Sequence, residues 1–134
     1  CVADHGYHRA EDAGSRHGLA THHIPMLWLG GALRGPRSFG QLMTQTDLAA
    51  TLLRQLGLSS ERFAFSRNVL GTNYSYPFAY YTFNDGFGFI DSTGVTVMEN
   101  VGEQLLEQHP SPSAERIARG RALLQTTHDD LARR

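Results

Sequence analysis

The chain has 134 residues, which suits one domain; 40% are hydrophobic and 19% charged, and the net charge is −1. This composition predicts a soluble globular fold and argues against disorder, and with a near-neutral charge no surface for non-specific nucleic-acid binding is expected. No apolar run approaches the roughly 20 residues of a membrane-spanning helix. Every basic residue is arginine, and the single cysteine excludes an internal disulfide.

The opening tripeptide CVA has the character of the end of a buried strand, and it runs directly into Asp4, His5 and Gly6. Because the rest of such a strand is missing, we expect the chain to begin within a domain. An open α/β sheet places its site at the carboxyl ends of its strands, and a carboxylate beside an imidazole suits a divalent ion. Taken alone, the sequence Asp4-His5-Gly6 fits a simple turn better, with Asp4 as its cap and His5 in an ordinary hydrogen bond.

A long polar loop is predicted from Tyr7 to His23, where no apolar periodicity occurs. Five of the seven histidines lie in the first 23 residues. This clustering favours a metal or phosphate site, because imidazole ligates metals and its cation pairs with anions. The alternative is a solvated loop, and we expect at least two of these histidines to have no role. The loop histidines are His8, His17, His22 and His23, of which His23 has the most fixed position because it precedes a predicted strand.

The run IPMLWLGG predicts a central strand over Ile24–Leu29, buried on both faces as in parallel sheets that are covered by helices. A helix is predicted over Thr44–Leu58, capped by Thr44 or Thr46 and ended by Gly57. Its inward stripe is expected to consist of Ala49, Leu52, Leu53 and Leu56.

Three aromatic and β-branched segments follow, and the short turn sequences NDG and STG that join them predict an antiparallel meander. Asn100 with Glu103 resembles a capping box, which predicts a short helix ending near His109. The three segments of the meander are Phe78–Phe83, Phe87–Ser92 and Val95–Asn100.

A last helix is predicted over Ser113–Arg133, after the sequence PSPS. The chain is therefore of the α/β class: a helix-covered sheet over residues 1–71, then an antiparallel meander with a long C-terminal helix over residues 72–134. No GxSxG, glycine-rich phosphate loop or CxxC is present to carry other chemistry. The inner side of the last helix is expected to carry Ile117, Leu124 and Leu131.

Four blocks of the sequence, VADHG, HHIPMLWLGGAL, QTDLAATLLRQLGL and FAYYTFNDGFGFID, occur in an order and spacing that is similar to a known family. They resemble the C-terminal part of the lipoteichoic-acid-synthase-like sulfatases, which are phosphoglycerol transferases of the alkaline phosphatase superfamily. The similarity runs from Val2 to about Asn100. It implies that residues 1–71 are the C-terminal part of an alkaline-phosphatase-like sheet-and-helix core.

By this resemblance Asp4 and His5 are metal ligands, for Mn²⁺ or Mg²⁺ first and for Ca²⁺ or Zn²⁺ as alternatives. The Thr nucleophile and an acidic ligand are implied to lie upstream, so the chain is expected to be inactive alone. Many sulfatases bind the sulfate through a lysine in the loop after Asp-His-Gly, and the absence of lysine here counts against a sulfatase. His17, His22 or His23 would then contact the substrate.

The implied reaction is attack of the activated Thr on a phosphate or sulfate ester, such as a phosphoglycerol-bearing lipid, through a covalent intermediate. The catalytic domain of such enzymes usually faces the outside of the cytoplasmic membrane, anchored by upstream helices. Expected partners are the rest of the same enzyme and, through exposed sheet edges, a second copy of the fragment; no nucleic acid is expected. The alternative is a non-catalytic structural or interaction module that keeps the fold.

Overall fold

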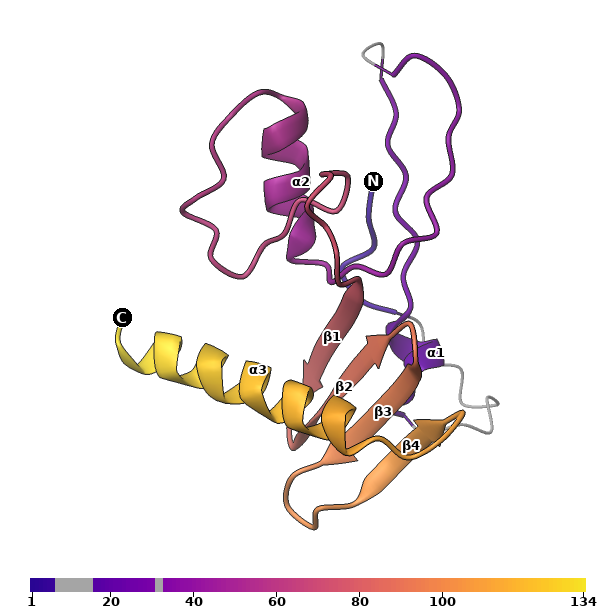
Figure 1. Ribbon diagram of the computed structural model, residues 1–134, viewed down its shortest axis with the longest axis vertical. Helices are drawn as coiled ribbons and strands as arrows, with labels where there is room; N and C mark the ends of the chain where they lie inside the picture. The colour runs from indigo at the N-terminus through magenta and orange to yellow at the C-terminus, as the bar shows by residue number, and fades with distance from the viewer. Residues whose placement is uncertain (7–15, 31–32) are drawn as a thin grey trace.

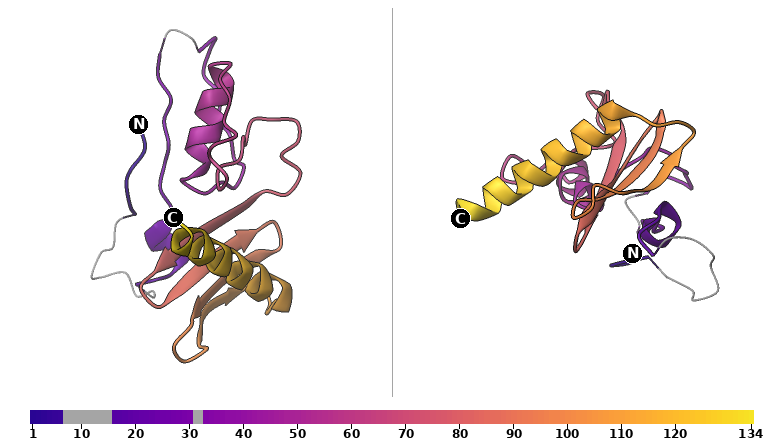
Figure 2. Two further views of the ribbon diagram at one scale, coloured as in Figure 1. Left: turned by 90° about the vertical axis from the view of Figure 1, so that its left-hand side faces the viewer. Right: turned by 90° about the horizontal axis from the view of Figure 1, so that it is seen from below.

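The computed structural model of the protein describes residues 1–6, 16–30 and 33–134. Its elements are α1 (Leu19–His22), α2 (Asp47–Gln55), β1 (Phe78–Phe83), β2 (Gly86–Asp91), β3 (Gly94–Glu99), β4 (Leu105–His109) and α3 (Ala114–Ala132). The strands form one antiparallel sheet in the order β1-β2-β3-β4 (Figure 1). Helix α3 crosses one face of this sheet and α1 lies on the opposite face (Figure 2). A mixture of helices and a sheet confirms the predicted class in its coarse form.

The predicted meander is confirmed, since β1, β2 and β3 pair antiparallel with tight turns between them. Side chains alternate between the two faces of the sheet, as the pleat requires. Both faces are covered, and β2 is buried along its whole length. The core cluster under α3 is built on Phe87, Phe89 and Met98, and the cluster on the α1 face is built on Ile90, Val95 and Val97.

The short helix predicted after Asn100 is wrong, because Leu105–His109 form a fourth strand that pairs with β3. The backbone of Glu103 has a φ of 52°, which lies outside the right-handed helical region. The backbone N–H of Glu99 donates to the carbonyl of Gln104 at 2.8 Å and closes the connection between the strands. A two-residue capping pattern is a weak local signal, whereas pairing with β3 satisfies the backbone of a whole strand.

The predicted C-terminal helix is confirmed as α3, and Ser113 is its N-cap residue, with a side-chain oxygen that accepts a backbone N–H. Ile117 and Leu124 pack against the aromatic cluster as predicted. Leu131 is 73% exposed, contrary to the prediction. The last turns of α3 extend beyond the edge of the sheet at β1 (Figure 1), and Leu131 lines an open hollow with Thr82 and Phe83 of that strand instead of packing in the core.

Gly120 brings α3 close to the sheet. A Cβ atom at this position would lie 2.0 Å from a ring carbon of Phe87, whose side chain is fully buried. Alanine is favoured over glycine in a helix by about 1 kcal/mol, but overpacking a core costs about 1–3 kcal/mol. Because the ring has no room to move, we expect Gly120→Ala to lower the free energy of unfolding by about 1–2 kcal/mol in urea denaturation.

The control for this prediction is the same substitution in a Phe87→Leu background, where the smaller side chain relieves the contact. There Gly120→Ala is expected to be neutral or stabilising, because only its helix propensity remains. An equal loss of stability in both backgrounds would show that contact with Phe87 is not the cause.

Helix α2 confirms the predicted helix and the way it ends. Gly57 has a φ of 72°, and its N–H donates to Arg54 O at 3.2 Å, while the N–H of Leu58 donates to Leu53 O at 2.9 Å. This pair of bonds is a Schellman motif, which needs glycine or asparagine at the left-handed position. Thr46 occupies the N-cap position, although its side chain makes no capping hydrogen bond.

The inward stripe predicted for this helix is wrong. Leu52 and Leu56 are 42% and 63% exposed. The helix instead turns a polar face towards the segment that precedes β1, where Ser66 Oγ accepts from the backbone N–H of Ala50 at 2.7 Å. The side of α2 that is buried is therefore the one that hydrogen-bonds to this segment, and not the one that carries the periodic leucines. The buried residues of α2 are Asp47, Ala50 and Thr51.

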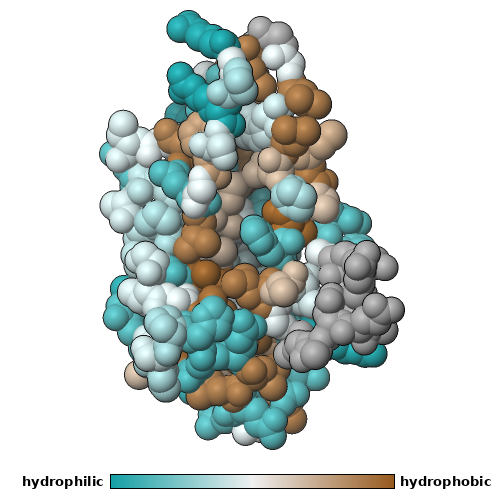
Figure 3. Space-filling view, turned by 90° about the vertical axis from the view of Figure 1, so that its right-hand side faces the viewer, coloured by the Kyte–Doolittle hydropathy of each residue, from teal (hydrophilic) through white to brown (hydrophobic). Residues whose placement is uncertain are grey.

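The central strand predicted over Ile24–Leu29 is also wrong. A single isolated bridge joins Met26 to Val2, and Leu27 and Leu29 are 56% and 76% exposed. Figure 3 shows the face of the molecule that lies to the right in Figure 1, and hydrophobic residues are at the surface in its upper part. A strand buried on both faces needs neighbouring strands and covering helices, and among the described residues the segment at Val2 is its one β-partner.

Candidate functional site

Asp4 and His5 lie side by side in the short turn that follows the bridge residue Val2. Asp4 Oδ1 lies 3.8 Å from His5 Nε2 and accepts a hydrogen bond from the backbone N–H of His5 at 3.0 Å. The side chains of Asp4 and His5 are 90% and 81% exposed. Two donor atoms that suit a divalent ion are thus open to the same region of solvent.

The second ring nitrogen of His5 determines how this residue can act. Its Nδ1 lies 2.8 Å from the carbonyl oxygen of Gly6, and because a carbonyl can only accept, Nδ1 carries the proton of the neutral ring. This bond and the charge of Asp4 raise the pKa of His5 above its usual value. The lone pair of the neutral ring is on Nε2, the atom that faces Asp4. Metal-bound histidines commonly orient their rings in this way.

The Asp4–His5 pair therefore fits metal ligation, but as a partial site. Across residues 1–6, 16–30 and 33–134, no group of three or more His, Cys, Asp or Glu side chains is placed to hold an ion. A hard ion such as Mn²⁺ or Mg²⁺ takes six oxygen-rich ligands and retains water readily. Two exposed protein ligands leave most of its coordination to water or to groups from elsewhere.

The Asp-His-Gly turn lies against α1. A Cβ atom on Gly6 would lie 1.8 Å from the carbonyl oxygen of Thr21, so a larger residue could not approach the helix this closely. On the other side the amide of Gln45 donates to the carbonyl of Ala3 at 2.9 Å. The fold thus brings the predicted metal ligands next to the segment that carries the predicted substrate-binding histidines.

Two of those histidines are stacked on the sheet. The ring of His22 lies on Tyr81, with centroids 3.8 Å apart and planes 8° apart, and the ring of His17 lies on Phe83 at 4.1 Å and 11°. Both aromatic rings belong to β1. Packing on the sheet accounts for the placement of His17 and His22, and their contact with substrate stays a prediction.

His23 is placed differently, because it is exposed at the end of α1 and its backbone N–H donates to Leu19 O at 3.0 Å. Among the three predicted substrate-binding histidines, its ring is the one that is not stacked on the sheet in the part of the chain that is described. His8 lies in residues 7–15, outside the described residues.

No family model, no curated protein and no solved structure matches this chain. The resemblance to phosphoglycerol transferases therefore depends on the four sequence blocks. Among the helices that the structure describes, none is both long and apolar enough to cross a lipid bilayer.

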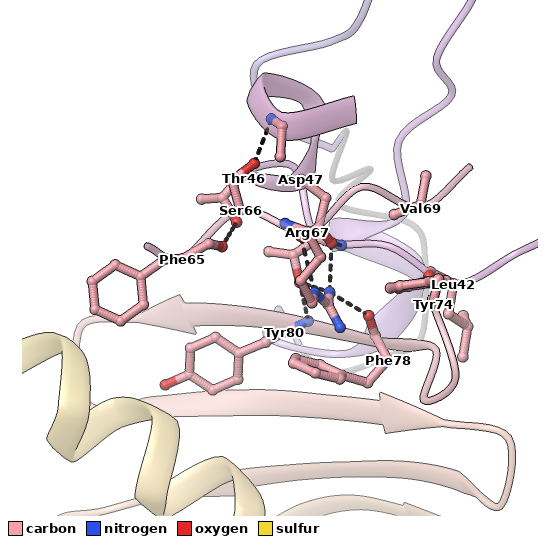
Figure 4. Close-up of polar contacts among 12 residues, drawn as sticks. Leu42, Thr46, Asp47, Phe65, Ser66, Arg67, Val69, Tyr74, Phe78 and Tyr80 are labelled. Atoms are coloured by element: carbon pink, nitrogen blue, oxygen red, sulfur yellow. Dashed lines mark hydrogen bonds and ion pairs between the residues drawn. The ribbon is translucent and has the colours of Figure 1, made fainter. Parts of the chain in front are cut away.

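A buried ion pair that the sequence reasoning missed lies between α2 and β1 (Figure 4). The Asp47 side chain has no exposed surface. Its Oδ1 accepts from the backbone N–H and the Nε of Arg67 at 2.8 and 3.0 Å, and its Oδ2 accepts from Arg67 Nη2 and from the Thr44 N–H. In the sequence, Asp47 stands at the start of the predicted helix, where a negative charge is favourable, and nothing in the local pattern indicates a partner 20 residues away.

The Arg67 guanidinium also attaches this region to the sheet. It lies over the ring of Phe78 at 3.5 Å from the centroid, and its Nη2 donates to Phe78 O at 2.9 Å. The hydrogen bonds of Asp47 are all made within the chain, and burial leaves the carboxylate no access to a ligand. The pair is a structural connection between α2 and the first strand.

A hollow of about 310 Å³ lies between the C-terminal half of α3 and the turn that joins β1 to β2. Its rim includes Asn84, Asn100 and His128. The hollow is lined by residues of α3, whereas α1 lies on the opposite face of the sheet (Figure 2). This hollow therefore does not serve the Asp4–His5 pair.

Proposed function

We propose that this chain supplies two metal ligands, Asp4 and His5, to a metal-dependent phosphoglycerol transferase or sulfatase-type ester hydrolase that acts on phosphate or sulfate esters. The observation that carries the proposal is the pair itself. Asp4 Oδ1 lies 3.8 Å from His5 Nε2, and the other ring nitrogen of His5 is hydrogen-bonded to the carbonyl of Gly6. The four sequence blocks support the same function.

In this proposal residues 1–71 belong to an alkaline-phosphatase-like core, and the Thr nucleophile and remaining ligands come from other parts of the same enzyme. The catalytic domain faces the outside of the cytoplasmic membrane. Its substrate is a phosphate or sulfate ester, such as a phosphoglycerol-bearing lipid.

The roles of this chain's residues follow from their chemistry. Asp4 contributes a hard anionic oxygen and His5 a neutral nitrogen. A divalent ion held there, Mn²⁺ or Mg²⁺, would neutralise charge on the transferring group and lower the pKa of the nucleophile. Of the three predicted substrate-binding histidines, His23 is the exposed one, at the end of α1, and we assign it the protonation of the leaving alcohol.

The test is a Mn²⁺ titration followed by NMR, in which the paramagnetic ion broadens the ring signals of nearby histidines. We expect the His5 signals to disappear at a lower Mn²⁺ concentration than those of His128. Asp4→Asn removes one charge beside a divalent ion, which costs on the order of 1–2 kcal/mol in solvent, so the concentration needed should rise about tenfold.

The chain offers a matched control in α3, where His128 and Asp129 are a second adjacent pair of histidine and aspartate. There the Asp129 carboxylate accepts a hydrogen bond from Gln125. Asp129→Asn should leave the broadening of His5 unchanged. If His5 and His128 broaden at the same Mn²⁺ concentration, or if Asp4→Asn has no effect, then Asp4 is only a turn residue and the proposal fails.

A further inference from the structure

Tyr81 occupies a particular place on the sheet, on the face opposite α3. Its ring covers Gly88 of the neighbouring strand, where a Cβ atom would lie 2.1 Å from a carbon of the Tyr81 ring. Glycine at this position lets the ring lie flat against the backbone. Burial, together with the charge of Glu107, raises the pKa of Tyr81, so its hydroxyl stays protonated and remains a hydrogen-bond donor.

Tyr81 contacts the histidine segment at two points. Its ring stacks on the imidazole of His22 with centroids 3.8 Å apart, and its hydroxyl donates to the backbone carbonyl of His17 at 2.7 Å. The hydroxyl bond joins two residues that are 64 positions apart in the sequence. One side chain thus fixes both ends of the segment that contains α1.

The same segment has a second attachment to the sheet. The backbone N–H of Leu19 donates to Glu107 Oε2 at 2.9 Å, and the Leu19 side chain packs against the core cluster on this face. Helix α1 is also in contact with Gly6 through the carbonyl of Thr21. A continuous series of contacts therefore runs from the sheet through α1 to the Asp-His-Gly turn.

We propose that Tyr81 is a positioning residue for the Asp4–His5 site: by holding α1 on the sheet, it fixes the surface against which Gly6 rests and so orients the two metal ligands. This inference depends on the proposed function, because it assigns Tyr81 a role in metal binding. It also gives the antiparallel sheet a role in the site, because Tyr81 belongs to strand β1.

The experiment compares Tyr81→Phe and Tyr81→Leu with the same substitutions at Tyr80. Tyr80 is the neighbouring residue of β1, packs on the α3 side of the sheet, and has a buried hydroxyl with no hydrogen-bond partner in the described part of the chain (Figure 4). The Tyr80 variants therefore control for a general loss of stability. Two quantities are measured by NMR: the ring-proton shifts of His22, which the stacked ring displaces, and the broadening of His5 by Mn²⁺.

For Tyr81→Leu we expect the His22 shifts to move to those of an unstacked imidazole and the affinity for Mn²⁺ at His5 to fall about tenfold, as for loss of a group that orients metal ligands. Tyr81→Phe keeps the stacked ring and loses one hydrogen bond, so the affinity should fall about threefold with the His22 shifts largely retained. The Tyr80 variants should change neither quantity.

Two other outcomes would overturn the inference and differ from each other. If Tyr81→Leu releases His22 while Mn²⁺ broadens His5 as in the parent chain, the site exists but Tyr81 does not position it. If Mn²⁺ fails to broaden His5 preferentially in the unsubstituted chain, the proposed function fails first and the positioning role fails with it.

Discussion

An Asp47→Ala variant is expected to lose about 3–5 kcal/mol of unfolding free energy, since it breaks a buried ion pair by removing one partner. The carboxylate has no exposed surface and accepts hydrogen bonds from Thr44 and from three nitrogens of Arg67. Without it, the guanidinium stays held over the ring of Phe78, and two backbone N–H groups lose their acceptor. Each such group carries a desolvation cost of about 1–3 kcal/mol.

The side chain of Arg67 is 27% exposed, so water can reach part of the uncompensated charge and the lower end of the range is expected. The control is Asp130→Ala, which removes an i,i+4 partner of Arg134 at the surface and should cost no more than about 0.5 kcal/mol. Urea denaturation measures both. A loss of less than 1 kcal/mol for Asp47→Ala would contradict the structural role assigned to this pair.

The parts of the fold that could be predicted are those encoded locally. The meander follows from short turn sequences and from strand segments that pair with their immediate neighbours in the chain. The end of α2 follows from one glycine, Gly57, and the start of α3 from one serine, Ser113. In each case the residues that decide the structure are close in the chain: even the most distant partners of the first hairpin, Phe78 and Asp91, are 13 positions apart.

The failures share the opposite property. Whether Ile24–Leu29 forms a buried strand depends on neighbouring strands, and its apolar character alone cannot supply them. Leu105–His109 became a strand because β3 offered a free edge, which no capping pattern near Asn100 reports. The buried face of α2 was decided by hydrogen bonds to residues 66–69, so its leucines were a misleading guide.

The candidate site shows the same division. The residues alone present Asp4 and His5 as an adjacent carboxylate and imidazole that fit a simple turn, and their role as metal ligands is what the resemblance implies. The position of α1 against Gly6 is not predictable from the local sequence, because the segment that contains α1 is attached to Tyr81, which lies 64 positions beyond His17. The adjacency of the two side chains can be read from the sequence, whereas the contacts that surround them are visible only in three dimensions.

The second large effect is expected at Arg116, whose side chain is almost completely buried between α3 and the sheet, with 2% exposure. Its Nε donates to Thr96 Oγ at 3.0 Å and its Nη1 to Thr93 Oγ at 2.8 Å, and its Nη2 donates to the carbonyl of Ser111. Among the described residues, Arg116 is the largest buried side chain, and Arg116→Ala removes it and leaves those acceptors without this donor. We expect a loss of about 3–5 kcal/mol by urea denaturation. Arg121→Ala on the same helix, which breaks an exposed pair with Glu103, should cost no more than about 1 kcal/mol.

The dependence of this loss on pH separates charge from packing. Burial raises the pKa of Asp91, but hydrogen bonds from Thr93 and Tyr76 and the charge of Arg116 outweigh it and lower that pKa below 3.8. A lowered folded-state pKa means that the stability gained from Asp91 is present above 3.8 and is lost as the pH falls through the folded-state value. Without Arg116 that pKa rises towards its ordinary value, so Arg116→Ala should cost more at about pH 7 than at about pH 2. An equal cost at both would mean that Arg116 acts by packing and hydrogen bonding alone, and that its attraction to Asp91 contributes nothing measurable.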